Sequence, residues 1–178
     1  MATVNIFPNA DVGNTWTISS GSDAYAMLTS DGSGNVSSDS ADIYATAVGE
    51  FCSVQMQDLN AGLSGATINY VRPIVKHNNA TRGQTYEIVM KITTSGTVYY
   101  AESTGTVNAN SLWQTTGFTT RTTSDGSNPW TFSEINGLTL DLVLNAHSGG
   151  TTGITYAYYT IGYTEAADNN AVFFGTNF

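Results

Sequence analysis

Charged side chains are scarce in this sequence. Only 11% of its 178 residues are charged, and 5 Lys and Arg stand against 14 Asp and Glu, which gives a net charge of −9. This share is less than half of that usual in soluble globular proteins. The basic residues are scattered along the chain, at Arg72, Lys76, Arg82, Lys91 and Arg121. Neutralising phosphates takes clustered Lys or Arg, so neither nucleic acid nor an anionic membrane surface is expected as a partner.

Cysteine and long apolar runs are also lacking. Cys52 is the only cysteine, so no intrachain disulfide can form and a disulfide-stapled scaffold is excluded. It lies in the apolar run 51–54, which favours a small buried residue over a catalytic thiol, since no His is close to it in sequence. No signal peptide is expected at the N-terminus, and no apolar run approaches membrane-spanning length.

Alternation of apolar and polar residues, with a period of two, runs through most of the chain. It is clearest in residues 85–94 and 138–144, and weaker versions occur at 15–18, 24–28, 43–48, 51–56, 66–75, 97–102, 113–123 and 154–163. Period two is typical of half-buried strands. The pattern predicts a single soluble all-β domain: an antiparallel two-sheet β-sandwich, jelly-roll-like.

Local signals refine this prediction. Ser95-Gly96 predicts a hairpin, and Pro73 inside a strand pattern predicts an edge position or a bulge. Thr131 and Glu134 have the spacing of a capping box, and Gly137 follows as a stop signal. One short helical turn is therefore expected near residues 131–137.

The two ends are expected to differ from the central domain. We divide the chain into an N-terminal arm (1–12), the β-sandwich (13–164) and a C-terminal tail with an aromatic end (165–178). Phenylalanines are costly to leave in water on a polar tail. The tail therefore either folds back on its own domain or docks on a neighbouring subunit. The candidate partner-binding residues are Phe7, Phe173, Phe174 and Phe178.

A polar loop carries the weak candidate for a metal site. Oxygen-bearing side chains recur there at alternate positions, at Asp31, Ser33, Asn35 and Asp39, so that a curled loop could direct several oxygens to Ca²⁺. Against this, Val36 replaces the glycine that such loops require, and any flexible surface loop has similar polar residues. We therefore expect no cofactor, with calcium as the weaker alternative.

No catalytic residue is predicted. The sequence has no nucleophile elbow, zinc-ligand spacing or nucleotide-binding glycine motif. His77 and His147 lie in polar, turn-like segments where exposure is expected. An enzyme is not predicted, although two carboxylates could still meet in space. Trp130 and Tyr99 are candidates for stacking on a sugar, although large aromatics also fill cores.

The order of signals resembles a known group of proteins. Phe7-Pro8-Asn9-Ala10 leads to a strand with Trp16, a Gly/Ser/Asp loop, and the segment from Asn128 to Leu138 that reads NPWTFSEINGL. This order is similar to that of small β-sandwich virion proteins of tailed bacteriophages, of the head decoration (cement) or fibre type.

That resemblance implies a structural role. The expected function is capsid decoration: a homotrimer that binds the major capsid protein on the outer head surface of the virion and stabilises subunit junctions. The chain has no repetitive stalk, which favours decoration over a fibre. The alternative is a tail- or fibre-associated carbohydrate-binding module for host attachment, and a small glycanase on the same scaffold is a third possibility.

Overall fold

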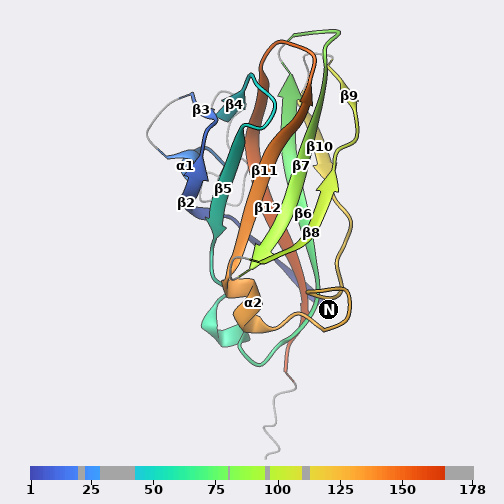
Figure 1. The fold of residues 1–178 in the computed structure, drawn as a ribbon. Coiled ribbons are helices and arrows are strands. Elements are labelled where there is room, and N and C mark those ends of the chain that lie inside the picture. The colour runs from blue at the N-terminus through green and yellow to red at the C-terminus, as the bar shows by residue number, and fades with distance from the viewer. Residues whose placement is uncertain (20–22, 29–42, 80, 95–96, 110–112, 167–178) are drawn as a thin grey trace, which may run out of the picture.

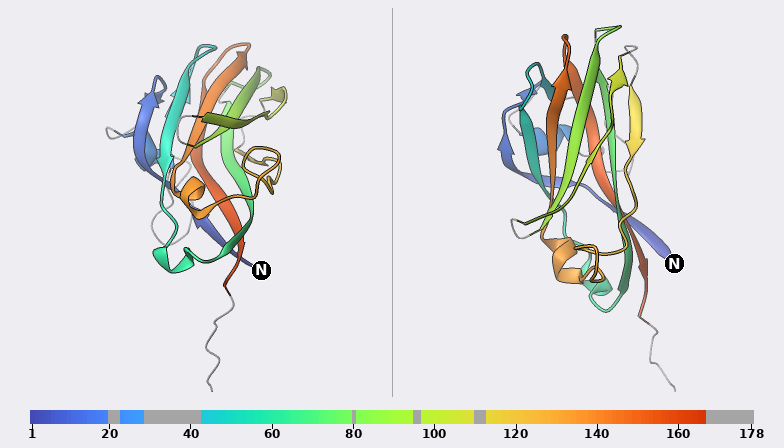
Figure 2. Two further views of the ribbon diagram at one scale, coloured as in Figure 1. Left: turned by 60° about the horizontal axis from the view of Figure 1, so that its bottom comes forward. Right: turned by 45° about the vertical axis from the view of Figure 1, so that its right-hand side comes forward.

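The computed structural model describes residues 1–19, 23–28, 43–79, 81–94, 97–109 and 113–166, and these form two antiparallel sheets packed face to face (Figures 1 and 2). Sheet A has the order β10-β6-β12-β4-β3, and β1 also pairs with β12. Its strands are β1 (Ala2–Ile6), β3 (Thr17–Ile18), β4 (Ile43–Ala45), β6 (Thr67–Asn79), β10 (Gln114–Gly117) and β12 (Thr152–Thr164).

Sheet B has the order β2-β5-β11-β7-β8, and β9 also pairs with β7. Its strands are β2 (Pro8–Asn14), β5 (Phe51–Met56), β7 (Thr85–Thr94), β8 (Thr97–Ser103), β9 (Val107–Asn108) and β11 (Leu138–His147). Three short helical segments join them: α1 (Ala24–Leu28), η1 (Ala61–Leu63) and α2 (Phe132–Asn136). No helix in the described part of the chain is long and apolar enough to cross a membrane.

The strand order is that of a jelly roll. From β4 onward, the chain passes from one sheet to the other at each connection except those between β7, β8 and β9, which all lie in sheet B. As a result, β4, β12, β6 and β10 face β5, β11, β7 and β8. Two such interlocked four-strand sets are the jelly-roll arrangement of two Greek keys. The predicted fold class, an antiparallel two-sheet sandwich, is therefore confirmed.

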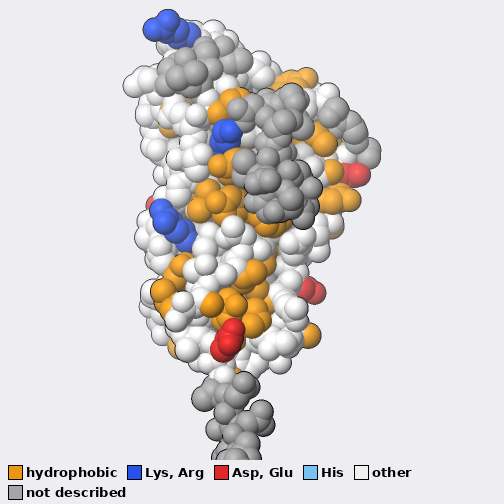
Figure 3. Space-filling model, turned by 180° about the vertical axis from the view of Figure 1, so that it is seen from behind, with side chains coloured by type: hydrophobic (Ala, Val, Ile, Leu, Met, Phe, Trp, Pro, Cys, Tyr) orange, Lys and Arg blue, Asp and Glu red, His pale blue; other side chains and the backbone are white. Residues whose placement is uncertain are grey.

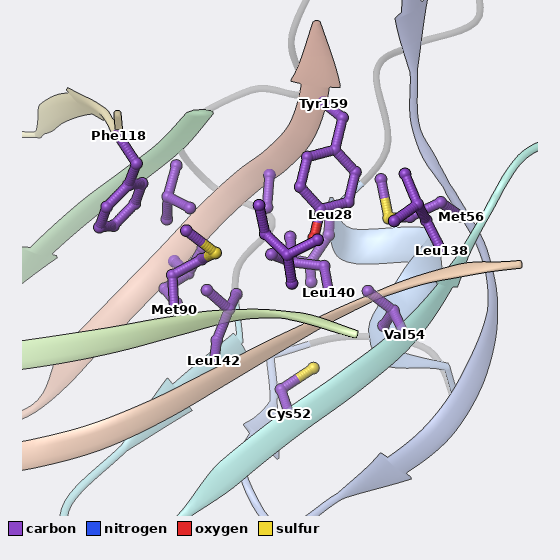
Figure 4. Packing of buried hydrophobic residues seen from close by; sticks show 14 of the residues in the cluster. Leu28, Cys52, Val54, Met56, Met90, Phe118, Leu138, Leu140, Leu142 and Tyr159 are labelled. Atoms are coloured by element: carbon purple, nitrogen blue, oxygen red, sulfur yellow. The ribbon is translucent and has the colours of Figure 1, made fainter. Parts of the chain in front are cut away.

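The predicted alternation also places the core. In β11 the four leucines at 138, 140, 142 and 144 are fully buried, while Asp141 and Val143 lie on the outer side. β7 pairs with β11 along its length and buries its own alternate residues against the same interior. Figure 4 shows side chains of both sheets meeting there, including Cys52 and Tyr159. Each buried Leu contributes roughly 1.5–3 kcal/mol through removal of apolar area from water.

The predicted helical turn is present as α2. The Thr131 side chain accepts a hydrogen bond from the Glu134 N–H, and the Glu134 carboxylate accepts one from the Thr131 N–H at 2.8 Å. Gly137 forms the C-cap. α2 lies at one end of the sandwich, before β11 (Figure 1).

Residues 24–28, expected as a strand, form the helix α1. The Asp11 carboxylate accepts hydrogen bonds from the N–H groups of Ala24 (2.9 Å) and Tyr25 (2.6 Å), which no partner within the helix could satisfy. The segment AYAML is also rich in good helix formers. A cap from a residue thirteen positions earlier overrides the period-two pattern.

Residues 1–12, described above as an N-terminal arm, are hydrogen-bonded into the sandwich. β1 pairs with β12 in sheet A, and β2 pairs with β5 in sheet B. Ile6 is buried in the core. In this structure the segment thus contributes one strand to each sheet of its own chain.

Two further expectations differ from the structure. Pro73 lies inside sheet A, opposite Tyr159, where its carbonyl accepts the Phe118 N–H at 3.0 Å just beyond the end of β10. His77, expected at the surface, is fully buried. Its ring nitrogens lie 2.8 Å from the Tyr86 hydroxyl and 2.7 Å from the Thr116 hydroxyl, so both have a partner inside the sandwich.

Candidate functional site

The strands of sheet A carry no acidic residue, although the chain as a whole is strongly acidic. All six are free of Asp and Glu, while β6 contains Arg72 and Lys76. Both basic side chains follow the outward alternation of β6, opposite the buried Val71 and Val75. The outer side of this sheet is therefore basic on a protein of net charge −9.

Aromatic rings gather on the same side. The Tyr158 ring lies 5.4 Å from the Phe7 ring and 5.8 Å from the Tyr156 ring, between centroids, with interplanar angles of 41° and 34°. Phe7 and Tyr158 are partly exposed, whereas Tyr156 is buried. Figure 3 looks at this side and shows hydrophobic side chains gathered there with Lys and Arg between them. We call the set the aromatic face: Phe7, Arg72, Lys76, Trp113, Tyr156 and Tyr158.

The two cations are held differently. The Lys76 ammonium lies over two rings, 5.9 Å from the centroid of Trp113 and 5.7 Å from that of Tyr156. Arg72 is exposed, and its Nε donates to the Phe118 carbonyl at 3.2 Å. Its guanidinium fits over Gly117, where a Cβ would come within 2.5 Å of Nη2. Because a guanidinium has five N–H groups, Arg72 keeps donors for a further acceptor.

Polar groups border the rings. The Thr160 hydroxyl donates to the Asn5 side-chain oxygen at 2.9 Å, next to Tyr158 along β12. Partial burial and the neighbouring Tyr156 raise the pKa of Tyr158, and the nearby Arg72 acts in the opposite direction. Tyr158 therefore stays neutral near pH 7, and its hydroxyl can donate as well as accept hydrogen bonds.

This combination suits a ligand with one apolar face and a polar rim. A ring presents a negative face to weakly positive C–H groups, and Arg72 can bind a carboxylate with two parallel hydrogen bonds. The fold and this surface define a jelly-roll β-sandwich with basic and aromatic side chains on the outer side of sheet A.

The predicted sugar-stacking pair is not formed. Trp130 is buried, and its Nε1 donates to the Arg121 carbonyl at 2.9 Å. Its ring lies 6.5 Å from that of Tyr100, the neighbour of Tyr99. Trp130 is thus a core residue, and its ring is not available for stacking on a sugar.

The other candidate residues are placed as follows. Phe7 lies on the aromatic face against Tyr158 of its own chain. Phe173, Phe174 and Phe178 lie outside the described residues, as does the loop with Asp31, Ser33, Asn35 and Asp39. Elsewhere in the described ranges, no group of three or more His, Cys, Asp or Glu could hold a metal ion.

The sequence contains a signal for part of the aromatic face. Tyr156, Tyr158 and Thr160 share one side of a predicted strand, and no Asp or Glu occurs between residues 67 and 79 or between 152 and 164. The sequence does not show that β6 pairs with β12. This pairing places Ile74 opposite Tyr158 and Arg72 opposite Thr160. Only tertiary structure brings these two strands together.

Comparison with known proteins finds the fold in distant structures only. No protein-family model matches the chain, and no curated protein does. The chain is similar to the CBM36-1 domain of a multidomain xylanase from the hindgut metagenome of Trinervitermes trinervoides, with 12% identity over 93% of this chain and 100% of that one (TM-score 0.46).

Two other solved structures are similar to the same extent. One is the C-terminal CBM6 of LamC, a laminarinase from Zobellia galactanivorans, with 13% identity over 90% of this chain and 98% of that one (TM-score 0.42). The other is a Stig cyclase, Fisc, from Fischerella sp. TAU, with 11% identity over 92% and 100% (TM-score 0.45). At this level of similarity these structures carry no argument about function. The comparisons show no link to bacteriophage proteins.

Proposed function

We propose that this chain is a non-catalytic carbohydrate-binding domain and that it binds an acidic glycan along the aromatic face of sheet A. The observation that carries the proposal is that neighbouring aromatic rings and two cations share the outer side of a sheet whose strands contain no Asp or Glu. Phe7 and Tyr158 supply the platform for a sugar ring, and Arg72 supplies the donors for its carboxylate.

The charge distribution favours an acidic over a neutral glycan. On a protein of net charge −9, a polyanion is repelled by most of the surface and needs a local basic region to bind. The Arg72 guanidinium provides fixed donors at such a region, since it is anchored on the Phe118 carbonyl. Two parallel hydrogen bonds from Arg to a carboxylate are among the strongest polar contacts in proteins.

Capsid decoration, the function expected from the sequence resemblance, remains a prediction. The homotrimer and the capsid partner are likewise predictions, since Phe173, Phe174 and Phe178 lie outside the described residues. Carbohydrate binding, the alternative expectation, now has a specific surface on which it can be tested.

The test is titration calorimetry with polyuronate oligosaccharides and with neutral oligosaccharides of equal length. Arg72→Gln is expected to weaken binding of the acidic ligand about 10-fold, the equivalent of roughly 1.4 kcal/mol. Tyr158→Ala is expected to weaken binding of acidic ligands similarly, because the stacking surface is lost. Arg82→Gln is the matched control, since it removes one exposed positive charge away from the face.

Two results would contradict the proposal. One is the absence of binding to any glycan tested. The other is binding that neither Arg72→Gln nor Tyr158→Ala reduces. Tighter binding of neutral than of acidic chains would retain a carbohydrate-binding domain but overturn the ligand class. Raising the salt concentration should weaken the binding of the acidic oligosaccharides but not that of the neutral ones, because salt screens the interaction between exposed charges.

A further inference from the structure

The outer side of sheet B has a hollow of about 540 Å³, on the opposite side of the sandwich from the aromatic face. Its apolar lining includes Val12, Phe51, Val98 and Val143. Lys91 and Asp141 also line it. We call this set of six residues the sheet B hollow. It draws on β2, β5, β11, β7 and β8, and so covers the whole width of the sheet.

Exposed apolar side chains are concentrated there. Among the described residues, the large hydrophobic ones with high exposure are Met1, Val12, Val48, Phe51 and Val98. Val12, Val98 and Phe51 line the hollow, with exposures of 60%, 50% and 38%. Val48 precedes Gly49, which is also part of the lining. Exposed apolar surface gathered in one place marks an interaction site, whereas scattered residues do not.

A positive and a negative side chain stand side by side at its centre. Asp141 and Lys91 are direct partners across β11 and β7. The Asp141 carboxylate accepts hydrogen bonds from the hydroxyls of Ser53 and Thr93, the latter at 2.7 Å, so its position is fixed from both sides. In the described part of the chain the ion pair within 4 Å is Arg121–Glu102, which leaves Lys91 without a carboxylate at that distance.

We propose that the sheet B hollow is a self-association surface and that its occupant is a second copy of this chain. A two-fold axis running along the strands, between β7 and β11, places Lys91 of each copy over the partner's Asp141. One contact thus forms two opposite-charge pairs, which makes the surface self-complementary, as an isologous dimer requires. A two-fold axis across the strands would instead bring like charges together.

The rim fits the same occupant. Rotation about that axis exchanges the β8 side with the β5 side, so the exposed Val98 of each copy is buried against sheet B of the other. A glycan suits this hollow less well, because among the described residues that line it Phe51 is the one aromatic side chain and the other apolar ones are aliphatic. The proposal does not depend on carbohydrate binding, since it concerns the opposite sheet.

Light scattering after size-exclusion chromatography, over a wide range of concentrations of the full chain, tests the proposal. We expect a reversible dimer. Val98→Asp and Lys91→Glu should each raise its dissociation constant at least about 10-fold, through a charge buried in the apolar rim and through repulsion of the partner's Asp141. Thr120→Asp, at an exposed position outside the hollow, is the matched control and should leave the dimer intact.

A second variant separates lost association from lost folding. Lys91→Glu combined with Asp141→Lys exchanges the two charges and should restore association relative to Lys91→Glu alone, provided that thermal melting shows both variants folded. A monomer at every concentration would overturn the proposal. So would an oligomer that persists in both Val98→Asp and Lys91→Glu, because its contact would then lie elsewhere.

Discussion

Burial keeps several titratable side chains inside this sandwich neutral. Burial lowers the pKa of His77 to about 4 and raises that of its neighbour Tyr86 to about 12. Burial, with smaller contributions from the Asp11 and Asp141 carboxylates, likewise raises the pKa of Cys52 to about 12. The thiol is therefore protonated and inaccessible, which agrees with the structural role expected from its apolar surroundings.

His77 makes the stability of the fold dependent on pH. Its pKa in the folded state lies below the ordinary value of 6.5, so between about pH 6.5 and pH 4 the unfolded chain binds a proton that the folded chain does not. The free energy of unfolding should fall by about 3 kcal/mol as the pH falls through this window. Denaturant titrations at several pH values measure it.

His77→Gln isolates this contribution. Glutamine can hydrogen-bond to Tyr86 and Thr116 but does not titrate, so the variant should lose the part of the pH dependence that belongs to His77. The carboxylates titrate in both the wild type and the variant, so their contribution cancels when the pH dependence of one is subtracted from that of the other. Equal slopes for the wild type and the variant between pH 4 and 6.5 would show that the histidine is not buried as described.

At the scale of elements, strands with local signals could be predicted from sequence and their irregularities could not. The alternation of β7 and β11 and the capping box of α2 are local patterns, and the structure has them where they were expected. In β12, however, the register shifts between Ile154 and Tyr156. Ile154 packs in the core, whereas the Tyr156 ring lies against Tyr158 and Lys76 on the outer side. A strict period of two assigns both to one face.

The aromatic face depends on that irregularity. A bulge adds one residue to a strand and reverses which side chains point outward beyond it. A bulge is set by the fit between neighbouring strands, here β12 and β6, and so it leaves no mark in the strand's own sequence. The helix α1 is a comparable case, because its cap, Asp11, lies on another element.

The cap of α2 gives a prediction at this scale. Thr131→Ala should lower the free energy of unfolding by about 1 kcal/mol, because the Glu134 N–H loses its acceptor. Ser133→Ala is the control: Ser133 is exposed within the same helix, and alanine is the better helix former, so stability should be unchanged or slightly higher. Thermal or denaturant unfolding of the two variants compares them directly. Equal losses would mean that the capping box does not stabilise the helix.

At the scale of the whole molecule, the two proposed binding surfaces lie on opposite outer sides of the sandwich. The strands of sheet A carry cations and aromatic rings but no acidic residue, whereas sheet B has an apolar hollow around Lys91 and Asp141. The buried core separates the two surfaces, so a substitution on one of them should leave the structure of the other unchanged. The two proposals are therefore separable: Arg72→Gln should leave association intact, and Val98→Asp should leave glycan binding per chain intact.

The N-terminal segment contributes one strand to each sheet of the sandwich. β1 extends sheet A along β12, and the chain then crosses to sheet B as β2. Ile6, at the end of β1, is 2% exposed, and Phe7 follows directly on the aromatic face. A free arm could be removed without cost, but a paired strand that buries its last residue could not.

Shortening the chain to begin just before Phe7 should therefore lower the free energy of unfolding by at least about 2 kcal/mol, from the lost burial of Ile6 alone. It should also expose the edge of β12 and promote aggregation. Ile6→Ala should reproduce most of the loss in stability, at about 2–4 kcal/mol. Asn5→Ala, at an exposed position bonded only to Thr160, should cost under about 1 kcal/mol. If the shortened chain unfolds at the same denaturant concentration as the full chain, residues 1–6 are an arm that serves contacts outside the domain.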